Sequence, residues 1–76
     1  LKTVCKSKPE IVSQFDAAGY YHIQVFGPMK LTTQPQGYTG QVYSVRAWTK
    51  TPPKCPWDFV VKCSDGAILQ QTPDAC

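Results

Sequence analysis

The sequence predicts one small α+β domain, in which a single N-terminal helix packs on an antiparallel β-meander that disulfide bonds stabilise. A helix-capping pattern at residues 7–10 is followed by apolar residues at helical spacing. Three later segments alternate apolar and polar residues with the period of a β-strand. Four cysteines in 76 residues supply an even set that is suited to disulfide formation.

The composition fits one domain over residues 1–76. With 42% hydrophobic and 17% charged residues, the chain is too apolar and too lightly charged for a disordered tail. Its apolar runs are too short for a transmembrane helix, so we expect no membrane contact. The net charge of +3 allows weak attraction to phosphate or to an acidic surface, although a solvated basic edge is the simpler interpretation.

The first elements follow from local signals. Residues 1–6 are expected to form a short strand. Residues 7–10 (Ser-Lys-Pro-Glu) form a capping box with proline in the first turn, which predicts a helix over residues 8–18. Gly19 can end this helix in the left-handed conformation. The apolar face of the helix consists of Ile11, Val12, Phe15 and Ala18.

The rest of the chain predicts strands. The expected strands cover residues 20–25, 29–33, 42–48, 58–64 and 67–71, with a loop over residues 34–40. Strict alternation in the first strand predicts that Tyr21, Ile23 and Val25 share one face. Asp65-Gly66 predicts a two-residue hairpin turn. The expected core is Ile11, Phe15, Ile23, Val25, Val45, Phe59 and Val61.

The predicted hairpin constrains the disulfides. If Ser64 pairs with Ala67, the numbers of cross-strand partners sum to 131, as those of Cys55 and Cys76 also do. A strand rises about 3.3 Å per residue and bridged Cα atoms lie within about 7 Å, so a bond from Cys55 to Cys63 is disfavoured. Cys5 with Cys63 is therefore the preferred second bond, although all three connectivities remain open.

The cysteines also predict the compartment. The absence of a CxxC motif and the single histidine argue against a metal site, and nothing indicates a cofactor. Disulfides persist in oxidising compartments, so we expect a secreted protein. The start at Leu1 fits a mature product whose secretion signal was removed, or a chain from which it was left out.

Catalytic chemistry has little support in the sequence. His22 is the only imidazole, so a two-histidine acid/base pair is impossible. Glu10 is committed to the helix cap and Asp65 to a turn. Neither a nucleophile elbow nor a phosphate-binding glycine motif is present. We therefore expect His22 to be a half-buried sheet residue and the protein not to be an enzyme.

Several short segments resemble the small secreted guanyl-specific fungal ribonucleases. They are SQFDAAGY at residues 13–20, Tyr20-Tyr21-His22, Val60-Val61-Lys62 and Ala67-Ile68-Leu69, in an order that fits the predicted helix and meander. The resemblance covers about half the chain and implies a ribonuclease-like fold.

The same resemblance assigns the family's catalytic positions to this chain. His22 corresponds to the first catalytic histidine, and Ser44 stands where the glutamate base would be. Asp58 or Phe59 stands at the arginine position, and the second histidine falls near Gln71. Three of these four positions have lost their functional residue, so the resemblance implies a pseudoenzyme in which His22 is vestigial. Arg46 could partly restore the cation.

A ribonuclease-like fold without its catalytic residues is similar to the secreted effectors of cereal powdery mildews and related plant-pathogenic fungi. This implies secretion, with translocation into the host cell as a further step, and binding of a host protein, for example an immune receptor, or of host RNA. It also implies a bond between Cys5 and Cys76, in conflict with the hairpin register. The six-stranded MAX effectors are an alternative that resembles residues 55–76 but has no helix at residues 7–19.

Two classes of function therefore remain. The first is a monomeric, non-catalytic effector that binds its partner protein, and weakly RNA, through aromatic and basic residues. Its candidate binding residues are Tyr38, Arg46, Trp48 and Lys50. The second is a small secreted toxin or hydrolase inhibitor that inserts the loop at residues 34–40 or 49–56 into an enzyme cleft.

Overall fold

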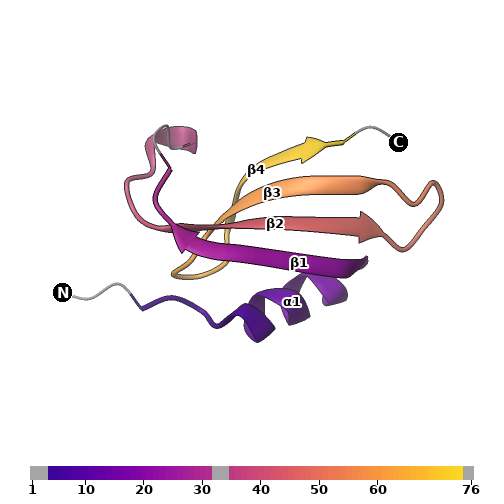
Figure 1. Cartoon of the computed structure of the whole chain (residues 1–76), viewed down its shortest axis with the longest axis horizontal. Coiled ribbons are helices and arrows are strands. Elements are labelled where there is room, and N and C mark those ends of the chain that lie inside the picture. The colour runs from indigo at the N-terminus through magenta and orange to yellow at the C-terminus, as the bar shows by residue number, and fades with distance from the viewer. Residues whose placement is uncertain (1–3, 32–34, 75–76) are drawn as a thin grey trace.

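In a computed structural model, residues 4–31 and 35–74 are described, and they form one helix packed on one antiparallel sheet (Figure 1). The four strands lie in the order β1-β2-β3-β4. This confirms the predicted α+β meander. The elements are α1 (Lys8–Ala17), β1 (Tyr20–Met29), the 3-10 turn η1 (Pro35–Gly37), β2 (Val42–Thr49), β3 (Pro56–Lys62) and β4 (Ile68–Pro73).

Helix α1 begins at the predicted capping box. The Ser7 hydroxyl accepts a hydrogen bond from the Glu10 backbone N–H at 3.3 Å, and the Glu10 carboxylate accepts one from the Ser7 backbone N–H at 2.9 Å. Ala18 caps the C-terminus, one residue earlier than predicted, and Gly19 follows with a left-handed φ of 99°. Local sequence signals therefore position both ends of the helix.

This capping box predicts a pH dependence of stability. Hydrogen bonds from the Ser7 backbone and hydroxyl, with help from Lys6, lower the pKa of Glu10 below its ordinary value of 4.5. A carboxyl whose pKa is lower in the folded state stabilises the fold above its unfolded pKa, and this contribution is lost as pH falls through the folded value. In thermal melts across the acidic range, Glu10→Gln should lose less stability on acidification than the wild type. Parallel curves for the two proteins would contradict this role.

The core lies between α1 and the sheet. The Phe15 ring packs edge-on against Phe59, with ring centroids 4.8 Å apart, and against Tyr20 at 5.8 Å. Five predicted core residues are buried, namely Ile11, Phe15, Val45, Phe59 and Val61. Ile23 and Val25 are only partly buried, at the margin of the cluster. Buried residues that were not predicted are Val42, Tyr43, Ala47, Cys63 and Leu69.

A β-bulge in β1 overturns the predicted alternation. His22 has a left-handed φ of 52°, and the pairing with β2 shifts between Tyr21 and Gln24. The extra residue reverses the phase of the strand, so Tyr20 joins the core while Tyr21 is 40% exposed.

The predicted strand over residues 29–33 is also wrong in its described part. β1 continues through Gly27-Pro28 and ends at Met29, and residues 30–31 are not in a strand. Proline is tolerated here because β1 is an edge strand of the sheet. Residues 32–33 lie outside the described chain. In the predicted loop, η1 forms a short 3-10 turn.

The connection between β3 and β4 is longer than the predicted two-residue turn. The strands end at Lys62 and resume at Ile68, so Ser64 does not pair with Ala67. The Lys62 carbonyl accepts from the Gly66 N–H at 2.8 Å, and Gly66 has a φ of 75°. Gln14 of α1 donates to the Gly66 carbonyl at 2.7 Å. A side chain at position 66 would collide with the side chain of Gln14. This contact with the helix favours a wide turn that only glycine fits.

The disulfide between Cys5 and Cys63 confirms the preferred pairing, with the two Cα atoms 4.6 Å apart. The bond between Cys5 and Cys76 that the effector resemblance implied is therefore wrong. The predicted pair of Cys55 with Cys76 includes a residue outside the described chain. No described cysteine is a free thiol.

The N-terminal segment is held at Lys6, whose carbonyl accepts a hydrogen bond from the Tyr43 hydroxyl of β2 at 2.6 Å. The Lys6 N–H donates to the Cys63 carbonyl at 2.7 Å, beside the disulfide. The bond draws residues 4–6 to the β3–β4 turn instead of alongside an edge strand, so the strand predicted over residues 1–6 is wrong where it is described. Residues 1–3 lie outside the described chain.

Candidate functional site

The face of the sheet opposite α1, here called the open face, carries polar and aromatic side chains. Helix α1 packs on the face that contains Val45 and Phe59, and alternate residues of each strand point to the other side. Directly paired residues of antiparallel strands share a face, so the register sorts the open-face residues into rows. The rows are Gln24, Arg46, Asp58 and Thr72; Phe26, Ser44, Val60 and Gln70; and Tyr21, Trp48 and Pro56.

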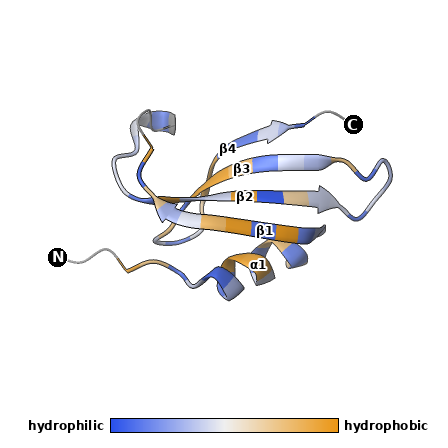
Figure 2. Ribbon diagram, in the orientation of Figure 1, coloured by the Kyte–Doolittle hydropathy of each residue, from blue (hydrophilic) through white to orange (hydrophobic). Residues whose placement is uncertain are grey.

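An ionic cluster lies at the centre of the open face. Arg46 donates from Nε to Asp58 Oδ1 at 3.0 Å and from Nη2 to Asp58 Oδ2 at 3.4 Å, and Nη2 also donates to Asp74. The hydrogen bond with Asp58 raises the pKa of the Arg46 guanidinium. Figure 2 shows hydrophilic positions side by side in the middle of β2 and β3. Because two carboxylates surround one guanidinium, this centre offers no surplus positive charge to a phosphate.

Aromatic side chains lie beside the ionic cluster. The Trp48 ring is 4.9 Å from the His22 ring in an edge-to-face contact and 6.0 Å from the Arg46 Cζ. Tyr21 pairs with Trp48 across the strands, and Lys54 Nζ lies 5.8 Å from the Tyr21 ring centroid. In the next part of the face, Phe26 is 51% exposed. The open face therefore combines accessible aromatic area with a paired arginine.

His22 lies at the margin of this face, at the bulge. It is exposed rather than half-buried as predicted, because the bulge moves it out of the regular strand. Trp48 is its ring neighbour. Among the described residues, no carboxylate forms an ion pair with His22. The chain thus places no acid/base partner against its single imidazole within the described part.

The positions carried over from the ribonuclease resemblance are divided between the two faces. Ser44 and Asp58 lie on the open face, in adjacent rows. Gln71 pairs with Phe59 and therefore points to the core side, away from Ser44. The residues at the family's four catalytic positions do not form one constellation in this fold.

The four predicted binding residues lie in three separate places. Arg46 and Trp48 are neighbours, as their spacing on β2 requires. The Tyr38 ring lies 5.3 Å from Lys62 Nζ, and its hydroxyl donates to the Gln41 carbonyl. Lys50 forms an ion pair with Asp16 of α1 at 2.7 Å.

Residues of this site that were not predicted are Tyr21, Phe26, Asp58 and Asp74. The exposure of Phe26 follows from the sequence pattern. Polar Gln24 and apolar Val25 alternate between the two faces of the strand, so residue 26 falls on the same face as Gln24. The ion pairs of Arg46 depend on the register of β2, β3 and β4, which could not be predicted from the sequence.

Comparison with protein-family models, curated proteins and solved structures finds no match. Among the described residues, no group of three or more histidine, cysteine, aspartate or glutamate side chains is arranged to hold a metal ion. No helix in the described ranges has the length and apolarity needed to span a membrane.

Proposed function

We propose that this chain is a non-catalytic binding protein that contacts a partner protein through the open face around Trp48. The observation that carries the proposal is the exposed aromatic area of Tyr21 and Phe26 on the same face as the half-buried Trp48, which lies beside a guanidinium whose charge is already balanced. Tryptophan, tyrosine, phenylalanine and arginine are the residues enriched in the centre of protein interfaces.

A protein partner suits this face better than RNA. Nucleic-acid binding depends on lysine and arginine that neutralise phosphates. On the open face, the guanidinium of Arg46 faces the carboxylates of Asp58 and Asp74. Weak, salt-sensitive RNA binding remains the secondary proposal, because Lys62 and Tyr38 form a separate basic and aromatic pair at the other end of the sheet.

The disulfide supports the same biological setting that the cysteines predict from the sequence. The buried disulfide partner Cys63 supports an oxidising compartment and hence secretion. We propose a ribonuclease-like effector of a plant-pathogenic fungus, with a host protein as the partner. The helix α1 argues against the six-stranded alternative, which has no helix at these residues.

The binding proposal predicts which variants lose the partner. Tagged wild-type protein is used to capture host proteins from plant extract, and the captured partner is then titrated with purified variants. Trp48→Ala should weaken binding by about tenfold or more, because truncating a central aromatic residue removes a large buried contact. Val12→Ala, on the exposed side of α1, is the matched control and should bind like the wild type. Equal affinities for the wild type and Trp48→Ala would exclude the open face as the interface.

The pseudoenzyme proposal predicts that guanosine-containing RNA stays intact. An RNA substrate incubated with the purified protein should show no cleavage products, since general acid/base catalysis needs partners that His22 lacks among the described residues. His22→Ala should give the same result, and an active guanyl-specific ribonuclease serves as the positive control. Guanosine-specific products that disappear in His22→Ala would establish catalysis and make Arg46 the next residue to test.

The inhibitor alternative has one specific observation in its favour. The loop between β2 and β3 is held by hydrogen bonds from the Thr49 N–H to the Cys55 carbonyl at 3.2 Å and from the Thr49 hydroxyl to the Pro53 carbonyl at 2.9 Å. A preorganised loop loses little entropy when it enters a cleft. Inhibition assays against proteases and amylases distinguish this function from partner capture by the open face.

A further inference from the structure

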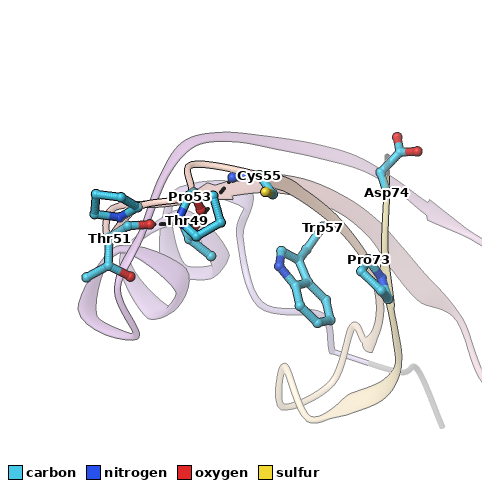
Figure 3. Close-up of a pocket in the computed structure, with 8 residues that line it drawn as sticks. Thr49, Thr51, Pro53, Cys55, Trp57, Pro73 and Asp74 are labelled. Carbon is cyan, nitrogen blue, oxygen red and sulfur yellow. Dashed lines mark hydrogen bonds between the residues drawn. The ribbon is translucent and has the colours of Figure 1, made fainter. Parts of the chain in front are cut away.

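A pocket of about 330 Å³ opens at the end of the core-side face, beyond the helix. Three of its lining residues are prolines, namely Pro52 and Pro53 on the β2–β3 loop and Pro73 at the end of β4. Trp57 of β3 lies between them (Figure 3). The pocket is therefore on the opposite side of the sheet from the open face, and of its lining residues only Asp74 also belongs to the ionic cluster of that face.

Trp57 provides a flat apolar surface in this pocket. It pairs with Ala47 and Pro73, which places it on the same face as the core. Its ring stacks against Phe59, with centroids 6.4 Å apart and planes inclined by 25°, so packing fixes the indole. Figure 3 shows the indole nitrogen on the side of the ring that faces Thr49 and Pro53.

The polar groups of the pocket differ in whether they have hydrogen-bond partners. The indole N–H of Trp57 has no hydrogen-bond acceptor among the described residues. The Pro53 carbonyl, in contrast, already accepts from the Thr49 hydroxyl at 2.9 Å and from the Cys55 N–H at 3.0 Å. The carboxylate of Asp74 is paired with Arg46 and points away from Trp57 (Figure 3). The pocket thus offers a donor on an apolar floor, while the Pro53 carbonyl and the Asp74 carboxylate are engaged.

We propose that this pocket binds a proline residue in an extended segment of a partner protein. The pyrrolidine ring would stack on the Trp57 indole between Pro53 and Pro73, and a main-chain carbonyl of the segment would accept the indole N–H. An ordinary residue would bring a backbone N–H into a place where acceptors are already engaged, which costs free energy. Proline has no such N–H, and its extended helix is preformed before binding.

The test uses nuclear magnetic resonance of the intact protein. Each of the two tryptophans gives one indole N–H signal, and the unlabelled probe is a capped polyproline peptide. The Trp57 signal should move on titration and the Trp48 signal should not. A glycine-serine peptide of the same length should move neither. A Trp57 signal that stays in place with polyproline, or moves equally with both peptides, would overturn the proposal.

Two matched variants test the role of the indole N–H. Trp57→Phe keeps an aromatic floor but removes the donor, and polyproline affinity should fall about fivefold, the usual effect of one neutral hydrogen bond. Trp48→Phe, on the open face, should leave this affinity unchanged. An unchanged affinity in Trp57→Phe would refute the hydrogen bond, whereas the wild-type titration tests the pocket even if that variant does not fold. The proposal does not depend on the open face, so failure of one does not imply failure of the other.

Discussion

Replacing Phe15 with alanine is expected to reduce the free energy of unfolding by about 3–5 kcal/mol. The Phe15 side chain is 1% exposed and contacts the rings of both Tyr20 and Phe59. Alanine would leave a cavity where α1 meets the sheet, and it would remove the edge-to-face contacts. Urea unfolding followed by circular dichroism measures the change.

Val12→Ala is the control for this experiment. Val12 lies on the same helix but is 37% exposed, so its truncation should change stability by less than about 0.5 kcal/mol. A loss below about 1 kcal/mol for Phe15→Ala would mean that the helix is not anchored on the sheet through this ring.

Removal of the Cys5–Cys63 disulfide should have an effect of similar size. The two cysteines are 58 residues apart, and a cross-link of that length reduces the entropy of the unfolded chain by an amount equivalent to about 4 kcal/mol. The double variant Cys5→Ala/Cys63→Ala avoids an unpaired thiol. We expect its unfolding transition to move to much lower urea, or the protein to be unfolded without denaturant.

The control for the disulfide variant is Val4→Ala. Val4 adjoins Cys5 but is 79% exposed, so it should keep the wild-type transition. If the free energy of unfolding of the double variant lies within about 1 kcal/mol of the wild-type value, the covalent bond is not needed to keep the surroundings of Cys63 folded.

Elements governed by short-range signals could be predicted from the sequence. The capping box, Pro9 and Gly19 determine the ends of α1 because their effects act within one turn of the chain. Alternation located β2 and β3 and identified Val45, Phe59 and Val61 as core residues.

Features that depend on distant contacts could not be predicted. The bulge at His22 brings Tyr20 over Phe59, and no local pattern indicates an extra residue in that strand. The β3–β4 turn was expected to be tight because Asp65-Gly66 is a common hairpin signal. Gln14 of α1 and the bond to Cys5 instead favour a wider turn.

The candidate site also has one part that local patterns predict and one part that depends on distant contacts. Arg46 and Trp48 lie side by side, as the predicted alternation of residues 42–48 implies, because residues two apart on a strand share a face. The carboxylates that surround Arg46 come from β3 and the end of β4, so their presence follows from strand register. Their charge shifts the expected ligand of this face from phosphate towards protein.

The link between Cys5 and Cys63 also affects how the protein withstands proteases. It joins the segment before α1 to the turn after β3, so the two loops within this span lie inside a covalent ring. A single cut in the β1–β2 or the β2–β3 connection leaves one cysteine of the pair in each fragment. The fragments then stay tethered, and the broken chain can keep its strands paired. One cut in either connection therefore need not release a piece of the chain.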